Sequence, residues 1–285
     1  MEHKTRITFD DMDGVLYPVN GKKEKIMIVI SGSEGGLEHS GKVAEYLAEH
    51  GIPAFALALF KTRHTGKSLD RIPVERVGRT IAWLKKQGYQ KFGIEGVSKG
   101  TEYAMAAAIQ YHELSCVILK TPSWYYSEGL EQKQPSGHSC WTLDGREIEY
   151  TPYKIRHFHM IKMLWETKEF NILPVNTGKE IVASSIIQIE KIHAPILIFS
   201  TKADTVWPSY ESGLKLCERL QKAQYPYPYK HVSFEHMSHM MLENCGKEIK
   251  YFFKSEKENP QACFDERNEM GRMCVEWIND VWSRH

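Results

Sequence analysis

The hydrophobic positions of the chain alternate between short continuous runs and longer stretches with helical spacing. Continuous apolar runs are typical of strands that are buried on both faces. We predict such strands at Ile26–Ile30, Pro53–Phe60, Phe92–Val97, Cys116–Leu119, Pro195–Ser200 and His231–Phe234. We predict helices at His39–Glu49, Arg71–Gln87, Thr101–Tyr111, Gly213–Gln221 and Asn268–Trp282. This alternation predicts an α/β fold, a mostly parallel sheet with helices on both faces.

The alternation has one long interruption. After Pro122 no clean strand follows until Pro195. The segment between them contains Asp144-Gly145, a hairpin signal, and a helix-like stretch at His157–Phe170. Insertions of this length usually serve a function, such as that of a lid. We therefore expect a single domain over residues 1–285, with residues 124–190 as a lid-like insertion within it.

The composition excludes several classes of protein. The 285 residues carry a formal net charge of +1, and no apolar run approaches the length of a membrane span. The six cysteines form no CxxC pair, and the N-terminus, MEHKTRITFDD, lacks the apolar core of a signal peptide. We expect a soluble, reduced, cytoplasmic protein that binds neither nucleic acid nor membrane.

The stretch Gly96-Val97-Ser98-Lys99-Gly100 matches the G-x-S-x-G motif of a nucleophile elbow. The motif alone is weak, but a predicted strand precedes Ser98 and a predicted helix follows it. In an elbow the serine backbone is held in a strained turn, and the glycines keep side chains away from the strand and the helix. Ser98 is therefore a candidate nucleophile rather than an ordinary residue before a helix.

A serine nucleophile requires a histidine base and a carboxylate that orients it. With this motif the acid and then the histidine follow the serine along the chain. Asp204 is the one carboxylate in the loop after Pro195–Ser200, because Glu211 falls on the next predicted helix. His236 and His239 both follow the last strand, and we favour His239, which lies deeper in the loop. Their HxxH spacing also suits a metal pair, but no third ligand is near, so we expect no metal.

The oxyanion of an acyl-transfer reaction also needs N–H donors. One is expected from Lys99, which follows the serine. The other is expected from the glycine-rich loop Ser31–Gly36, where Ser33 or Glu34 could donate. This loop has neither a GK[ST] sequence nor GxGxxG spacing, so we expect no nucleotide cofactor.

Taken together, these motifs resemble the acyl-CoA thioesterase / bile acid-CoA:amino acid N-acyltransferase family of α/β-hydrolases. The resemblance rests on GSEGG at Gly32–Gly36, GVSKG at Gly96–Gly100, DTVWPS at Asp204–Ser209 and SHMM at Ser238–Met241. It extends from about Ile26 to the C-terminus and is weakest in the insertion. It implies an α/β-hydrolase fold with Ser98 as nucleophile, Asp204 as acid and His239 as base.

The sequence also departs from the family pattern. Members that act on bile acids or long acyl chains carry an N-terminal β-sandwich domain, and we expect it to be missing because the first buried strand begins at Ile26. Ser238 stands where a glycine usually precedes the histidine. Ser98 stands where the N-acyltransferases have cysteine, which favours hydrolysis. The prediction is a serine hydrolase of small-molecule acyl thioesters, with a carboxylesterase, a peptidase-like hydrolase, an amine N-acyltransferase or a non-catalytic binding protein as alternatives.

Two further segments raise possibilities about the substrate. The basic stretch Lys61–Lys67 suits the phosphates of CoA, although a solvated loop explains it more simply. Aromatic residues of the insertion could line an acyl pocket or simply form core. They are Trp124, Tyr125, Tyr126, Trp141 and Tyr153.

Overall fold

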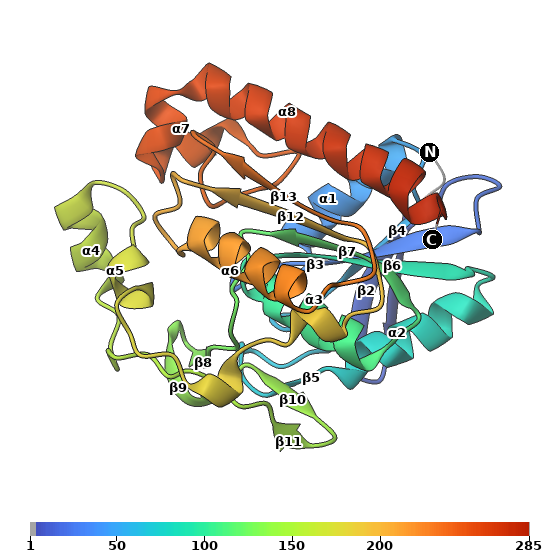
Figure 1. The fold of residues 1–285 in the computed structure, drawn as a ribbon, viewed down its shortest axis with the longest axis horizontal. Coiled ribbons are helices and arrows are strands. Elements are labelled where there is room, and N and C mark those ends of the chain that lie inside the picture. Colours follow the sequence, from blue (N-terminus) through green and yellow to red (C-terminus); the bar gives the residue numbers. More distant parts are fainter. Residues whose placement is uncertain (1–3, 285) are drawn as a thin grey trace.

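The computed structural model describes residues 4–284, and an eight-stranded sheet lies at its centre (Figure 1). Its strands are β1 (Thr5–Phe9), β2 (Met12–Tyr17), β3 (Lys25–Ile30), β4 (Ala54–Leu57), β6 (Lys91–Val97), β7 (Leu114–Lys120), β12 (Ile196–Thr201) and β13 (Tyr229–Phe234). The order across the sheet is β1-β2-β4-β3-β6-β7-β12-β13. From β4 to β13 neighbouring strands run parallel, while β1 and β2 are antiparallel additions at one edge. The predicted mostly parallel sheet is confirmed.

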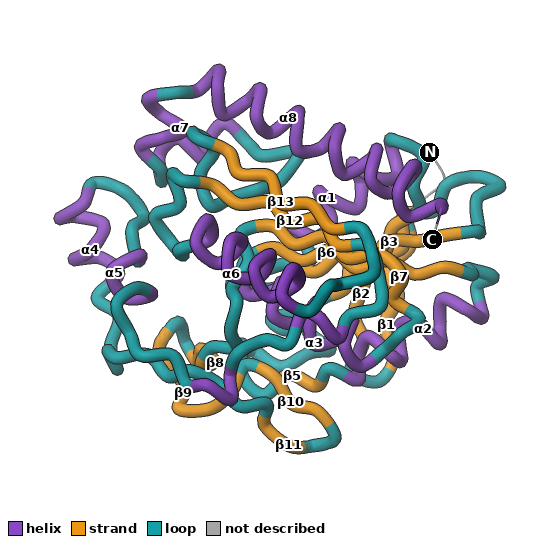
Figure 2. Tube along the Cα trace, in the orientation of Figure 1, coloured by secondary structure: helices purple, strands orange, loops and turns teal. Residues whose placement is uncertain are grey.

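Helices cover both faces of the sheet (Figure 2). On one face, α1 (Glu38–Glu49) and α8 (Pro260–Glu276) share a buried cluster in which Val43 and Leu47 lie with Met270 and Cys274. The other face carries α2 (Glu75–Lys86), α3 (Lys99–Gln110) and α6 (Ser209–Lys222). Helices on both faces leave the carboxyl edge of the parallel strands as the place for a site.

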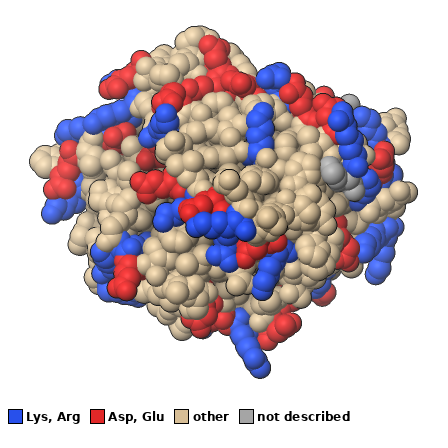
Figure 3. Space-filling model, viewed as in Figure 1, with Lys and Arg blue, Asp and Glu red and all other residues tan. Residues whose placement is uncertain are grey.

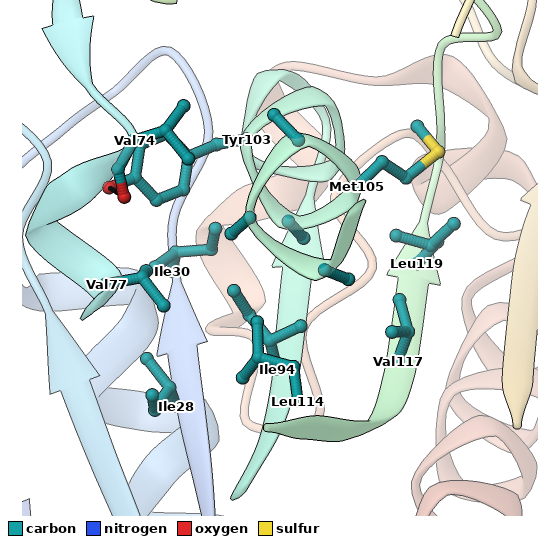
Figure 4. Packing of buried hydrophobic residues seen from close by; sticks show 14 of the residues in the cluster. Ile28, Ile30, Val74, Val77, Ile94, Tyr103, Met105, Leu114, Val117 and Leu119 are labelled. Carbon is teal, nitrogen blue, oxygen red and sulfur yellow. Dashed lines mark hydrogen bonds between the residues drawn. The ribbon is translucent and has the colours of Figure 1, made fainter. Parts of the chain in front are cut away.

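The centre of the second face is built around α3 (Figure 4). Tyr103 and Met105 point from this helix into the core, where Ile94 and Leu119 of the sheet are also fully buried. The alanines at 104, 106, 107 and 108 are buried as well, and their small side chains let the helix lie close to the strands. This packing fixes the start of α3, which directly follows Ser98.

The segment between β7 and β12 forms a separate group of elements. It contains β8 (Glu128–Glu131), β9 (Gln134–Ser139), β10 (Trp141–Leu143), β11 (Arg146–Glu147), α4 (Met160–Thr167) and α5 (Leu173–Asn176), and two 3-10 turns at Ala183–Ser185 and Ile189–Lys191. The predicted hairpin is confirmed, since β10 and β11 pair around Asp144 and Gly145, whose φ angles are +51° and +71°. In Figure 1, α4 and α5 lie to one side, away from the central sheet.

Several predicted element bounds were wrong. The strand expected over Pro53–Phe60 ends at Leu57, and residues 58–60 leave the sheet although they are buried. The helix expected from Arg71 begins at Glu75, because residues 72–73 form β5 (Ile72–Pro73), which pairs with β10. The last helix begins at Pro260 rather than Asn268, because proline suits the first position of a helix, where its missing N–H is not needed.

The rest of the C-terminal region is helical. The 3-10 helix η3 (Lys247–Tyr251) and the short α-helix α7 (Lys254–Glu258) precede α8, and a π-helical turn (Trp277–Val281) and a 3-10 turn (Trp282–Arg284) follow it. Within residues 4–284 no helix is long and apolar enough to cross a bilayer. All six cysteines are unpaired.

Candidate active site

Ser98 lies at the carboxyl end of β6, where the chain turns directly into α3. Its φ and ψ angles are +54° and −125°, a conformation that is costly for a residue with a side chain. The turn is held by hydrogen bonds from the Ser98 N–H to the Lys120 carbonyl (2.9 Å) and from the Thr101 N–H to the Ser98 carbonyl (2.9 Å). The strained strand-to-helix turn expected from the motif is therefore present.

The two glycines of the motif are required by close backbone contacts. A Cβ atom on Gly96 would lie 2.4 Å from the Gly100 carbonyl oxygen, and one on Gly100 would lie 2.5 Å from the Ser31 oxygen. Contacts this short with backbone atoms cannot be relieved by moving a side chain. The motif thus allows β6, the start of α3 and the loop after β3 to meet around Ser98.

Asp204 and His239 form a buried pair at the same edge of the sheet. They follow β12 and β13, whose last residues, Thr201 and Phe234, are register partners. The Nδ1 atom of His239 lies 2.9 Å from both carboxylate oxygens of Asp204. Asp204 also accepts hydrogen bonds from the N–H groups of Val206 and Trp207, each 2.9 Å long. These donors hold the carboxylate against the imidazole.

The structure separates the two candidate histidines. The side chain of His236 is 43% exposed and lies 2.9 Å from Glu266 of α8. His239 is buried, and the preceding Ser238 donates a 2.7 Å hydrogen bond to Glu256, which pairs with Arg267 at 2.7 Å. The residue that replaces the usual glycine therefore anchors the histidine loop to α7 and α8.

The glycine-rich loop after β3 reaches Ser98. A Cβ atom on Gly32 would lie 3.0 Å from the Ser98 Cβ atom and 3.0 Å from an oxygen of Glu34. The Glu34 carboxylate accepts a 3.0 Å hydrogen bond from the Gly32 N–H and lies 3.0 Å from His39 Nδ1. In the part of the chain that the structure describes, the N–H groups of Ser33 and Glu34 have no hydrogen-bond acceptor. They are thus available to a ligand.

The side chain of Lys99 makes contacts that the sequence did not indicate. It is buried, and its ammonium donates to the Ser127 hydroxyl and, at 3.1 Å, to the Glu128 carbonyl. Glu102, one turn further along α3, accepts hydrogen bonds from the Ser127 N–H (3.0 Å) and from Trp141 Nε1 (3.1 Å). The start of α3 therefore anchors the insertion beside Ser98.

The aromatic residues of the insertion have different surroundings. Tyr126 and Trp141 belong to the main core, and Trp124 lies under the Lys215 ammonium. Tyr125 and Tyr153 instead face Lys179, together with Trp207 of the loop that follows β12 and carries Asp204, which we call the acid loop. Lys179 was not singled out from the sequence, because a lone lysine in a loop carries no pattern.

The basic segment Lys61–Lys67 borders the glycine-rich loop. Lys61 Nζ donates a 3.0 Å hydrogen bond to the Glu34 carbonyl, and the side chains of Lys61, Arg63, His64 and Lys67 are exposed. A role in binding phosphate stays a prediction.

A buried charge cluster lies beneath the site. Lys120 Nζ is 2.5 Å from a carboxylate oxygen of Glu95 and 2.5 Å from one of Glu243. Oxygens of both carboxylates and the Cys274 sulfur lie within 4.8 Å of one another, which is a spacing that metal ligands also have. Because the Lys120 ammonium already contacts both carboxylates, we interpret this cluster as a buried ion-pair network rather than a metal site. Burial raises the pKa of Glu95 to about 7, and Lys120 opposes that shift.

The sheet order, the elbow turn and the paired acid and histidine define an α/β-hydrolase. Solved structures agree on the fold: MGS-M1, an α/β hydrolase from a Medee basin deep-sea metagenome library, is 14% identical with a TM-score of 0.61, over 99% of this chain and 98% of that one. GrgF from Penicillium sp. sh18 is 16% identical (TM-score 0.59; 99% and 98% covered). Est1E from Butyrivibrio proteoclasticus is 15% identical (TM-score 0.53; 98% and 99% covered).

A comparison of the sequence with protein families places the chain within one family of α/β-hydrolases. Residues 74–245 match the family described as BAAT / Acyl-CoA thioester hydrolase C terminal. The match covers more than half of the chain, so the chain belongs to this family, as the resemblance of its motifs predicted. No curated protein matches the sequence significantly.

Proposed function

We propose that this protein is a serine hydrolase that cleaves acyl thioesters of the acyl-CoA type, with Ser98 as nucleophile, His239 as base and Asp204 as the orienting acid. One observation carries the proposal. A serine in a strained strand-to-helix turn lies at the same sheet edge as a buried histidine–carboxylate pair. A histidine–carboxylate pair with a purely structural role does not need a strained serine nearby. Acyl transfer by a triad uses the serine together with the histidine–carboxylate pair.

The hydrogen bond to Asp204 determines which nitrogen of His239 reacts. With Nδ1–H donating to the carboxylate, Nε2 carries the lone pair and accepts the Ser98 proton. Ser98 Oγ attacks the acyl carbonyl carbon, the carbon–sulfur bond breaks, and the histidine proton passes to the departing thiolate. Water, deprotonated by His239, then attacks the acyl-enzyme and releases the acid with free Ser98.

Negative charge on the carbonyl oxygen needs preorganised donors. The N–H of Lys99 is the first of α3 and so has no acceptor within the helix. The N–H groups of Ser33 and Glu34 lie in the loop whose Gly32 approaches Ser98. We assign the oxyanion hole to Lys99 with Ser33 or Glu34, and the part of a lid over the site to residues 124–190.

The test is release of free thiol from acyl-CoAs that range from acetyl to palmitoyl. We expect turnover by the wild type and a loss of at least about 10³-fold in kcat for Ser98→Ala, Asp204→Asn and His239→Gln. His236→Gln is the matched control, because His236 lies in the same loop but faces Glu266. It should retain activity within about twofold.

The same variants, assayed on further substrates and with an active-site probe, test the alternative functions and the assignment of the site. Cleavage of p-nitrophenyl esters through Ser98, with no thiol release, would replace the thioesterase by a carboxylesterase. Equal loss in His236→Gln and His239→Gln, or full activity in Ser98→Ala, would contradict the proposed site. A fluorophosphonate probe that labels the wild type but not Ser98→Ala would support the nucleophile independently.

A further inference from the structure

The ammonium of Lys179 is enclosed by three aromatic rings. Its Nζ atom lies 4.6 Å from the ring centre of Tyr153, 5.2 Å from that of Tyr125 and 5.4 Å from that of Trp207. Two rings and the lysine come from the insertion, and Trp207 comes from the acid loop. Among the described residues Nζ has no hydrogen-bond partner, although it is shielded from solvent.

Two of the surrounding rings carry donors that are also unused. The Tyr125 hydroxyl and Trp207 Nε1 are buried without a hydrogen-bond partner in the part of the chain that the structure describes. Tyr125 is 1% exposed and Trp207 is 6% exposed, and their ring centres are 5.7 Å apart. Packing over ring faces explains why a lysine is tolerated here. It does not explain why both polar groups of the rings are left unpaired, because buried donors are normally satisfied.

The nearby carboxylates are already engaged. Glu102 lies 3.6 Å from the Lys99 ammonium and accepts three further hydrogen bonds. Glu128 pairs with Arg156 at 2.8 Å. Among the residues that the structure describes, Lys179 therefore forms no ion pair, and the Lys99 ammonium faces two of the same rings, Tyr153 and Trp207. Burial, together with the nearby charge of Lys99, lowers the pKa of Lys179 to about 7. A bound anion would oppose both effects and favour the charged amine.

This cluster adjoins the proposed catalytic residues. The Trp207 N–H is hydrogen-bonded to Asp204, and Lys99 directly follows Ser98 in the chain. Trp207 thus links the Lys179 cluster to Asp204 through its N–H and to Lys99, the neighbour of Ser98, through its ring.

We propose, on the basis of the function proposed above, that Lys179, Tyr125 and Trp207 form a subsite for an anionic oxygen group of the substrate. The ammonium, the hydroxyl and the indole N–H can each donate a hydrogen bond, and the ammonium carries positive charge, which suits a carboxylate or a phosphate. The carboxylate would be at the far end of the acyl chain, and the phosphate would belong to the leaving group.

Turnover distinguishes these two sources. Hexanoyl and 5-carboxypentanoyl thioesters are compared on CoA and on N-acetylcysteamine, an uncharged thiol. For an acyl carboxylate, we expect kcat/KM on N-acetylcysteamine to be at least about tenfold higher for the carboxylated chain, and Lys179→Met to remove this preference. For a phosphate, the preference follows CoA whichever acyl chain is present, and Lys179→Met again removes it.

Lys168→Met is the matched control, since Lys168 also lies over an aromatic ring of the insertion, at 4.9 Å from the centre of Trp165, but is exposed. It should leave both preferences unchanged. Tyr125→Phe, which removes only a hydroxyl, should weaken the preference about threefold or more and serves if Lys179→Met does not fold. No preference for an anionic group in the wild type, or the same preference in Lys179→Met, would overturn the subsite.

A binding experiment separates the subsite from the proposed reaction. Ser98→Ala is titrated calorimetrically with adipate and with inorganic phosphate, and with adipamide as the uncharged control. We expect one of the anions to bind at least about tenfold more tightly than adipamide, and the difference to vanish when Lys179→Met is added. Anion binding without any turnover by the wild type would retain the subsite and reject the hydrolase. Turnover of neutral thioesters with no anion effect would do the reverse.

Discussion

At the residue scale, the conformation of Ser98 is the feature that most strongly indicates chemistry. Its φ of +54° is unfavourable for a residue with a Cβ atom, and such strain costs about 1–3 kcal/mol. Close packing of Gly96 and Gly100 against the neighbouring backbone holds the turn in place. The fold holds Ser98 in this conformation in spite of its energetic cost, which is expected where the side chain must project from the sheet edge.

Replacing Ser98 therefore has an effect on stability that depends on the new residue. We expect Ser98→Gly to be about 1 kcal/mol more stable than Ser98→Ala, because glycine adopts the positive φ freely and only part of that gain is lost to the greater entropy of the unfolded chain. Urea unfolding of the two inactive variants measures the difference. An alanine variant that equals or exceeds the glycine variant in stability would argue against backbone strain at Ser98.

At the element scale, the loops that carry the site are held by buried ion pairs. Glu256 of α7 accepts hydrogen bonds from the N–H (3.1 Å) and hydroxyl (2.7 Å) groups of Ser238 and pairs with Arg267 of α8. The loop before His239 has no regular structure of its own. Its position therefore depends on these contacts with the C-terminal helices.

Glu256→Ala should accordingly destabilise the fold by about 3–5 kcal/mol, since it leaves Arg267 buried without its counter-ion. Glu258→Ala, an exposed change in the same short helix, should cost less than about 0.5 kcal/mol. The free energies of unfolding in urea provide the comparison. Similar free energies of unfolding for both variants would show that the contacts of Glu256 with Ser238 and Arg267 contribute little.

The insertion is held at its base in the same way. Glu102 of α3 is fully buried and accepts hydrogen bonds from both the N–H and the hydroxyl of Ser127 and from Trp141 Nε1. Glu102→Ala should release this base, so that limited proteolysis cuts residues 124–190 at least about tenfold faster than in the wild type. Glu131→Ala, an exposed change on β8, is the control. Unchanged cleavage in Glu102→Ala would place the anchor elsewhere.

At the scale of the whole molecule, acidic and basic side chains are interspersed on the surface shown in Figure 3, in keeping with a net charge of +1. No single-sign field covers this face. On this face, electrostatic selection of a substrate would depend on local groups. The charges that face Lys179 are Lys99 and Glu102 from α3 and Glu128 from β8, with the thiol of Cys140 nearby.

The low pKa of Lys179 makes stability depend on pH. The folded amine has a pKa of about 7, below its ordinary value, so between pH 7 and about pH 10 the unfolded chain binds more protons. Stability from this group therefore rises with pH, by at most about 1.4 kcal/mol per pH unit. Burial raises the pKa values of Tyr153 and Cys140 to about 12, which keeps them out of this range.

The contribution of Lys179 is isolated by comparing the pH dependence of the unfolding free energy between the wild type and variants. The gain in unfolding free energy from pH 7 to pH 9 should be larger in the wild type than in Lys179→Met, and Lys168→Met should behave like the wild type. Equal gains in all three proteins would show that the Lys179 amine is charged throughout this range. Urea titrations at the two pH values are sufficient.

The sequence predicted the sheet and the motif residues because both depend on local signals. Continuous apolar runs identify buried parallel strands, and a glycine two residues on either side of Ser98 meets the steric demand of the turn. The order of the loops then indicated Asp204 and His239. Errors concentrated at element ends, as at β5 and α8, where pairing with distant segments decides the bounds.

Fold class, the order of the site loops and the candidate residues were thus determined by the sequence alone, since each depends on neighbours in the chain. The sequence favoured His239 over His236, but only the tertiary structure shows that His239 faces Asp204, because contacts with Glu266 and Glu256 orient that loop. The tertiary structure alone brought Lys179 under Tyr125 and Trp207. These residues are distant in sequence and share no period, so only the folded insertion places their unpaired donors together.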